Sequence, residues 1–255
     1  MDEILEMFFK DKSPQDISNI LINLNRHNLN RKEHIKKYNK LRKLHGEIID
    51  SMLDYIEKGK YLPDKYHILI KPDITRETKG LKYNLNPNDE DDITILSELF
   101  LYKTHSKVPS LTDIYLEKKI FRNKDKIKML NAMKNSYVGL FKVIKVDSEE
   151  GYVYYQDVFT NKKFKVIDIA MSSTLKVDKK MPIHIYNRVI TIDNISFATG
   201  MHCIFGWSNK YIKEFIKKHK YNNCSDFSRC LLLYDISKKD NKLKVNHNHT
   251  YGYNR

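Results

Sequence analysis

Five segments rich in β-branched and aromatic residues follow one another between positions 137 and 205, and they constrain the fold more than any other feature. The segments are Tyr137–Val146, Tyr152–Phe159, Phe164–Ile169, Ile183–Ile192 and Ile195–Phe205. Short runs typical of turns separate them, at 147–151, 160–163, 178–182 and 193–194. Such residues favour extended backbone, and short connections favour antiparallel neighbours. The pattern predicts an antiparallel meander closed into a small β-barrel or half-barrel.

The N-terminal region has a helical period instead. Apolar residues recur at intervals of three and four between 31 and 58, namely at Ile35, Tyr38, Leu41, Leu44, Ile48, Met52 and Ile56. This is one apolar stripe on a long helix. An earlier helix is expected to begin at Ser13, with Pro14 in its first position. We expect the stripe to pack against the two preceding helices; the alternative is a coiled-coil homodimer through the 31–58 helix.

An irregular stretch separates these two regions. Pro72, Gly80, Pro87 and an acidic run before Ile93 predict a linker or long loop over 71–92. We therefore expect a helical domain over 1–70 and an α+β domain over 93–255. The second domain would contain helices at 93–104, from Ser110 and at 124–135, the β-module at 137–205, and a C-terminal helix and tail. The predicted fold class is α+β.

The β-module also carries a resemblance. It lies in the segments SYVGLFKVIKVD, GYVYYQDVFTNKKFKVIDIAMSSTL and IYNRVITIDNISFATGMHCIF. Together these resemble a small β-module of uncharacterised bacterial proteins, which also occurs in some proteins that carry the cysteine-rich SEC-C motif. The resemblance covers about 137–205 and implies a fold but no activity. The SEC-C cysteines and histidine are absent, so it implies no zinc site.

Composition limits the class of protein further. No apolar run approaches the roughly 20 residues of a membrane span. The first residues, MDEILEMFFKDK, lack the basic start of a secretory signal. Cys203, Cys224 and Cys230 have neither the spacing of a zinc site nor that of a disulfide framework. We expect a cytoplasmic protein with no membrane contact, no metal and no cofactor.

The chain is strongly basic, with a formal net charge of +14. The excess is concentrated at 26–45 and 207–255, and local basic patches are typical of polyanion binding. The candidate nucleic-acid-binding residues are Arg31, Lys32, Lys36, Lys37, Lys40, Arg42 and Lys43 in the first patch and Lys213, Lys217, Lys218 and Lys220 in the second. Alternatively, the abundance of Lys, Asn, Ile and Tyr reflects an A/T-rich genome, and the charge needs no ligand.

Three functions remain open. The leading hypothesis is a non-enzymatic protein that binds RNA or DNA through its basic helices. The alternative is a protein-interaction adaptor or regulatory protein that uses the long helix or the β-module. A third is a metal-dependent nuclease, because Asp64, Glu77 and Lys79 fit a sparse pattern of two acids and a lysine. The chain has no glycine-rich nucleotide-binding motif.

Polar and aromatic side chains of the β-module each allow two interpretations. Asp157, Asp168, Arg188 and Asp193 could converge on one carboxylate–arginine site, or Asp157 and Asp193 could make turn hydrogen bonds while Arg188 pairs with one of them. Aromatic residues and lysines could stack on unpaired bases and hold phosphates, or they could stabilise the sheet through cross-strand pairs. These are Tyr152, Tyr154, Tyr155, Phe159 and Phe164, with Lys142, Lys145, Lys162, Lys163 and Lys165. Strand register decides between the two.

Overall fold

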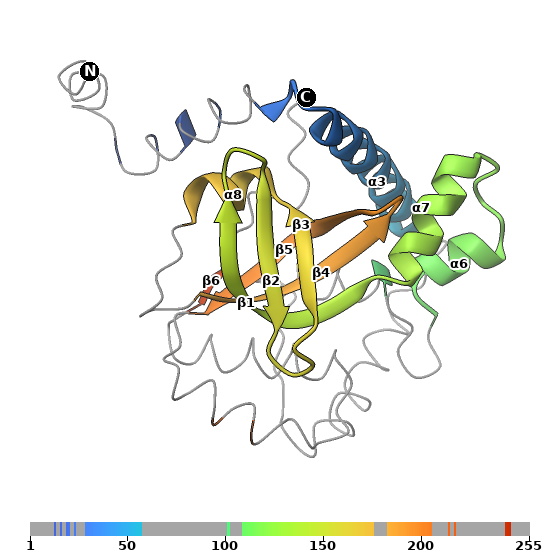
Figure 1. The fold of residues 1–255 in the computed structure, drawn as a ribbon. Helices are drawn as coiled ribbons and strands as arrows, with labels where there is room; N and C mark the ends of the chain where they lie inside the picture. Colours follow the sequence, from blue (N-terminus) through green and yellow to red (C-terminus); the bar gives the residue numbers. More distant parts are fainter. Residues whose placement is uncertain are drawn as a thin grey trace.

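A closed five-stranded β-barrel forms the centre of the molecule (Figure 1). The computed structural model describes residues 13, 16, 19, 20, 23, 29–57, 101–102, 109–175, 183–205, 214, 217 and 243–245. The barrel strands are β1 (Tyr137–Asp147), β2 (Tyr152–Asp157), β3 (Lys163–Ile167), β4 (His184–Ile192) and β5 (Ile195–Phe205). Their order is β3-β2-β1-β4-β5, and a parallel pairing of β3 with β5 closes the ring. The predicted α+β fold with a small barrel is confirmed, but the strand order is not that of an antiparallel meander, because β1 pairs with β4 and β3 pairs in parallel with β5.

Local chemistry explains where the strands end. Asp193 and Asn194, at φ of 50° and 62°, form the tight turn between β4 and β5. Two successive residues with positive φ suit the twist of an antiparallel hairpin. At the end of β2, the carboxylate of Asp157 accepts hydrogen bonds from the backbone N–H groups of Phe159 (2.9 Å) and Thr160 (2.7 Å). These bonds turn the chain, so β2 ends at Asp157 and not at the predicted Phe159.

A short helix, which the sequence pattern did not predict, follows β3. Helix α8 (Ile169–Thr174) begins at Asp168, whose carboxylate accepts a hydrogen bond from Met171 N at 3.0 Å. The predicted extension of β3 to Ile169 is therefore wrong, because Asp168 caps a helix there. Figure 1 shows α8 beside one end of the barrel, and Met171 packs into the barrel interior. One further strand, β6 (Leu243–Val245), pairs with β5 and was not predicted.

Alternating side chains fill the barrel. The interior cluster consists of Phe141, Val143, Val153, Tyr155, Val166, Met171, Ile185, Val189 and Ala198. Because neighbouring side chains of a strand point to opposite faces, Tyr152, Tyr154 and Gln156 on β2 lie outside while Val153 and Tyr155 lie inside. Full burial of a large apolar side chain stabilises a fold by about 1.5–3 kcal/mol. This cluster therefore fixes the register of the barrel strands.

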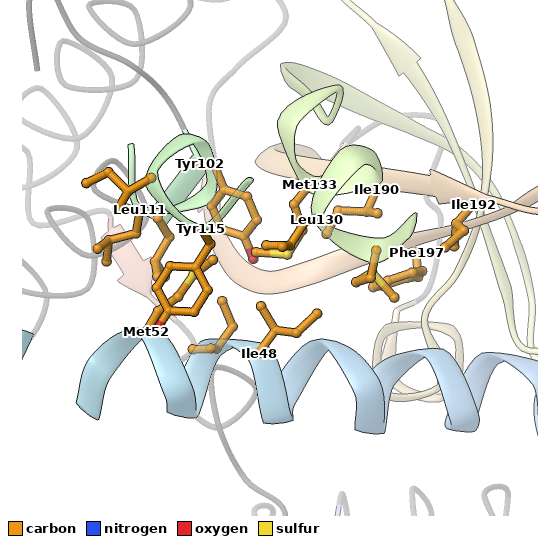
Figure 2. Packing of buried hydrophobic residues seen from close by; sticks show 14 residues of the cluster. Ile48, Met52, Tyr102, Leu111, Tyr115, Leu130, Met133, Ile190, Ile192 and Phe197 are labelled. Carbon is orange, nitrogen blue, oxygen red and sulfur yellow. The ribbon is translucent and has the colours of Figure 1, made fainter. Parts of the chain in front are cut away.

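Three helices cover the other face of β4 and β5. They are α3 (Glu33–Glu57), α6 (Leu111–Glu117), capped by Ser110, and α7 (Lys124–Lys134), capped by Asn123. Figure 2 shows Ile48 and Met52 of α3 facing Tyr115 of α6 and Leu130 of α7. The cluster continues onto the barrel through Ile190, Ile192 and Phe197. Ile35, Ile48 and Met52 are each 0% exposed. The apolar stripe is therefore buried against α6, α7 and the barrel, which follow it in the chain, while most residues of the two preceding helices lie outside the described part.

Several other expected elements can be compared only in part. Ser13 accepts a hydrogen bond from Asp16 N at 3.2 Å, as an N-cap does, and residues 16, 19, 20 and 23 are helical. Leu101 and Tyr102 of the expected 93–104 helix are helical and buried, and residues 214 and 217 of the C-terminal helix are helical. The expected linker at 71–92, and with it the boundary between 1–70 and 93–255, lies outside the described residues. Within the described part of the chain, α3 shares its hydrophobic cluster with α6, α7, β4 and β5.

Candidate nucleic-acid interface

Cross-strand rows of side chains make up the outer surface of β1, β2 and β3. In one row Tyr154 lies between Lys145 and Lys165, and in the next Gln156 lies between Lys142 and Lys163. A third row places Tyr152 between Asp147 and Ile167. We call this surface the lysine–tyrosine face and define it as Lys142, Lys145, Tyr152, Tyr154, Gln156, Lys163 and Lys165. The four lysines are exposed, and both tyrosines and Gln156 are partly exposed.

A β-bulge in β1 determines that Lys145 points to the outer surface of the barrel. The register between β1 and β2 shifts between Val143 and Lys145, so that Val143 pairs with the inward Tyr155 and Lys145 pairs with the outward Tyr154. The extra residue, Ile144, is 36% exposed. In a regular strand, Lys145 would share the inward side of Val143. The bulge therefore brings the ammonium group of Lys145 to the outer surface.

Lysine ammonium groups lie close to the tyrosine rings. Lys165 Nζ is 3.7 Å from the centroid of the Tyr152 ring and 6.0 Å from that of Tyr154. Lys145 Nζ is 5.2 Å from the Tyr154 centroid. Such cation–π pairs are favourable within about 6 Å. At the β2–β3 turn, Lys162 Nζ is 4.9 Å from the Phe164 ring. The face thus combines positive charge with aromatic rings held in fixed positions.

The first turn of α3 adjoins this face. The His34 ring stacks on Tyr152, with centroids 5.1 Å apart and planes at 8°. His34 Nε2 is 2.9 Å from the backbone oxygen of Glu150, and the Glu150 carboxylate pairs with Lys32. Gly151, at φ +73°, allows this close approach, because a Cβ there would lie 3.2 Å from Cδ1 of Ile35. The basic segment of α3 and the lysine–tyrosine face therefore meet at Tyr152.

The predicted basic residues of α3 and of the two positions before it, Arg31 and Lys32, have different environments. Arg31, Lys36, Lys37, Lys40 and Lys43 are exposed, and Lys37 lies 3.9 Å from Glu33. Lys32 is half-buried in its pair with Glu150. Arg42 Nη1 donates hydrogen bonds to the backbone oxygens of Ala198 (2.9 Å) and Thr199 (3.0 Å), so this guanidinium joins α3 to β5. In the second patch, Lys217 is helical and exposed, and Lys213, Lys218 and Lys220 lie outside the described residues.

Burial changes the acid–base properties of His45, one turn after Arg42. Its Nε2 contacts the hydroxyl of Tyr102, and the side chain is fully enclosed. Desolvation, and secondly the charge of Arg42, lower the pKa of His45 to about 3. His45 is therefore neutral in the folded protein at ordinary pH.

The four polar residues considered as a possible site make contacts with different groups. They are Asp157, Asp168, Arg188 and Asp193. Asp157 turns the chain after β2, and Asp168 caps α8, as described above. Asp193 pairs with Lys128 of α7. Arg188 donates a hydrogen bond to Ser136 Oγ at 2.9 Å and lies 4.5 Å from the centroid of the Tyr102 ring. The turn hydrogen bonds expected of Asp157 are confirmed.

The barrel interior contains one tyrosine with a perturbed pKa. Tyr155 is enclosed, and burial first, then the negative charge of Asp168, raise its pKa well above the usual value, while a hydrogen bond with Asn187 acts in the opposite direction. Its hydroxyl donates to Met171 Sδ at 3.3 Å. Of the aromatics considered for base stacking, Tyr155 is thus internal and Phe164 packs against the same interior cluster, whereas Tyr152 and Tyr154 lie on the outer surface and Phe159 is partly exposed.

Three further findings concern metals, membranes and the nuclease hypothesis. The described residues contain no group of three or more His, Cys, Asp or Glu that could hold a metal ion. Among the helices in the described part of the chain, none is long and apolar enough to cross a bilayer. Asp64, Glu77 and Lys79 lie outside the described residues, so the nuclease hypothesis stays a prediction.

The fold and the site together define a mixed α+β protein built on a closed small barrel with a basic, aromatic outer face. The chain belongs to DUF7986, a family of unknown function whose family model matches residues 32–245. This membership supports the expected relation to an uncharacterised family, but it does not support the resemblance to modules of SEC-C proteins. No curated protein and no solved structure matches the chain at a significant level.

Proposed function

We propose that this protein binds single-stranded RNA or DNA without catalysing a reaction, as a cytoplasmic nucleic-acid-associated protein. The observation that carries the proposal is the row in which Tyr154 lies between Lys145 and Lys165 on the outer surface of the barrel. Aromatic rings on a positively charged surface stack with unpaired bases, while lysines neutralise the phosphates beside them. A base on Tyr154 would have an ammonium group on either side for its flanking phosphates.

The connectivity of the barrel supports the same class of ligand. β1 lies between β2 and β4, β3 closes against β5, and α8 follows β3 in the chain. A five-stranded Greek-key barrel is the architecture of the OB fold, whose second and third strands form a surface that binds oligonucleotides and oligosaccharides. Most residues of the lysine–tyrosine face lie on the corresponding strands, β2 and β3, and Lys142 and Lys145 extend it onto β1. A shared fold does not by itself identify a ligand. The class of ligand is therefore inferred from the side chains of the face.

The exposed lysines of α3 extend the proposed interface. The stacked pair of His34 and Tyr152 joins this helix to the lysine–tyrosine face. Lys36, Lys37 and Lys40 are exposed in the first half of the helix and are suited to contact phosphates further along the strand. Because each lysine acts as a point charge and does not read base edges, we expect little sequence specificity.

Fluorescence anisotropy with labelled single strands and duplexes of RNA and DNA tests the proposal. We expect single strands to bind more tightly than duplexes, because stacking needs unpaired bases. Tyr154→Leu should weaken single-strand binding about tenfold, since stacking contributes about 1–3 kcal/mol per base. Tyr154→Phe, which keeps the ring, is the matched control and should change affinity by about twofold at most.

Salt dependence tests the lysines separately. Replacing Lys145 and Lys165 together by Gln should lower the slope of log affinity against log salt by about 1.4, at roughly 0.7 for each phosphate contact to a single strand. Lys124→Gln, which removes an exposed charge from α7, should leave the slope unchanged. No binding at low salt, or binding that Tyr154→Leu leaves intact, would overturn the lysine–tyrosine face as the site.

A further inference from the structure

The exposed side of α3 carries a charged stripe of regular spacing. Its members are exposed charged residues separated alternately by four and three positions: Lys36, Lys40, Lys43, Glu47, Asp50 and Asp54. The five intervals average 3.6 residues, the period of the α-helix, so the six side chains stay on one side of α3 along its length. The first half of the stripe is basic and the second half is acidic. The opposite side of α3 is buried in the hydrophobic cluster.

The order of charges in the stripe does not serve the stability of α3 itself. A helix is stabilised by acidic side chains near its N-terminus and by basic ones near its C-terminus. In α3 the last turn contains no basic residue. Asp50 and Asp54 occupy the C-terminal half, and Lys36 and Lys40 lie near the other end. A contact outside the helix accounts for this order better than the helix dipole does.

The stripe is complementary to its own reverse. Lys36 and Asp54, Lys40 and Asp50, and Lys43 and Glu47 are each symmetric about position 45. Suppose that a second copy of α3 lies antiparallel beside the first and that a twofold axis crosses the pair at the level of position 45 along the helix. Every lysine of the stripe then faces an acid of the other copy. A twofold interface repeats each such pair. A parallel pair of helices would place like charges opposite each other.

We propose that two copies of this chain associate antiparallel along the charged stripe of α3, with the lysines of one copy opposite the acids of the other. The proposal rests on the charge order of α3 and is independent of the proposed nucleic-acid binding. The partner is a second copy because the complementarity is internal to one sequence. The apolar side of α3 takes no part, since Ile35, Ile48 and Met52 are already buried.

The chemistry of the stripe sets the expected strength of association. Exposed ion pairs contribute little individually and are screened by salt. Glu47 also has a competing partner on its own chain, Lys126, at 3.3 Å, and Asp54 likewise makes an interaction within its own chain. We therefore expect a weak dimer that dissociates as the ionic strength rises. Phosphates bound at Lys36, Lys40 or Lys43 would compete with it.

A charge swap tests the arrangement directly. Sedimentation equilibrium at low ionic strength should show a monomer–dimer equilibrium. Lys40→Glu and Asp50→Lys each place like charges opposite each other at two symmetric positions, so each should weaken dimerisation about tenfold or more. The double variant restores opposite charges at both positions and should recover the dissociation constant to within about threefold. Within one helix these positions are about 15 Å apart, so they cannot rescue each other in a monomer.

Zero-length carbodiimide cross-linking adds a positional readout. It should join Lys40 of one copy to Asp50 of the other, and mixing isotopically labelled with unlabelled protein shows whether the link is between chains. Lys124→Glu on α7 is the control that should leave the dimer intact. Tyr154→Leu should also leave it intact, which separates this proposal from nucleic-acid binding. A monomer at every concentration, a dimer that resists salt, or a double variant that stays monomeric would each overturn the proposal.

Discussion

Gly139 faces Asp157 inside the barrel so closely that a Cβ at position 139 would lie 2.4 Å from Oδ2 of Asp157. The other carboxylate oxygen, Oδ1, is fixed by Phe159 N, Thr160 N and Thr160 Oγ1, the last at 3.0 Å. The carboxylate therefore cannot move aside without loss of the β2–β3 turn. Only glycine leaves room for it at this point of β1.

We expect Gly139→Ala to lower the free energy of unfolding by about 1–3 kcal/mol, as overpacking of a core does. Urea denaturation of the wild type and the variant measures the difference. In an Asp157→Ala background the obstructing carboxylate is gone, so Gly139→Ala should have a smaller effect there. Equal effects in the two backgrounds would show that the clash with Asp157 is not the cause.

The lowered pKa of the buried His45 should make the stability of the protein depend on pH. Its folded pKa, about 3, lies below the ordinary value of 6.5, so between these values the unfolded state binds the proton and the folded state does not. The contribution to stability is complete above pH 6.5 and is lost as the pH falls towards 3, by up to about 1.4 kcal/mol per pH unit. His45→Gln should reduce this slope in urea denaturation series, and identical slopes would contradict the assignment.

Substitution of Arg42 should lower the stability of the protein more than substitution of an exposed arginine does. Arg42→Met leaves the backbone oxygens of Ala198 and Thr199 without their guanidinium donor. Removing a charged hydrogen bond of this kind costs about 1.5–3 kcal/mol. Thermal and urea denaturation should show this decrease, whereas Arg122→Met, at an exposed site, should change stability by less than about 0.5 kcal/mol. A loss of equal size in both variants would refute the role given to Arg42.

A side chain at position 151 should disturb both the β1–β2 turn and the packing of α3 against it. Alanine at φ +73° is strained, and its Cβ would press on Cδ1 of Ile35 (3.2 Å) and Cδ1 of Leu29 (3.3 Å). We expect Gly151→Ala to destabilise the protein by about 1–2 kcal/mol and to increase hydrogen exchange at the start of α3. Gly46→Ala, within α3, is the control and should leave stability unchanged or raise it. Unchanged exchange around Ile35 would argue against this docking.

The strands and helix caps could be predicted because their signals are local. The Asp193-Asn194 turn, the caps at Ser13 and Ser110, and the apolar stripe of α3 each depend on residues close in sequence. The α8 helix was missed because Asp168 ends a strand and begins a helix with no intervening turn residue.

The candidate site could be predicted only in part, because its geometry depends on register. The tyrosines and lysines of the β-module were recognisable by type, but the bulge at Ile144 decides that Lys145 joins Tyr154 on the outer surface. The hydrogen bond from Arg42 to the backbone of β5 also could not be predicted, because the two residues are far apart in the sequence and meet only in the folded structure.

The parallel contact between Ile167 on β3 and Phe197 on β5 has a consequence for synthesis of the chain. Until β5 has left the ribosome, the nascent sheet β3-β2-β1-β4 has two edges with unpaired backbone groups. Such edges are templates for association with other chains. Premature termination between β4 and β5 should therefore yield an aggregation-prone product, because both edges of the sheet stay open.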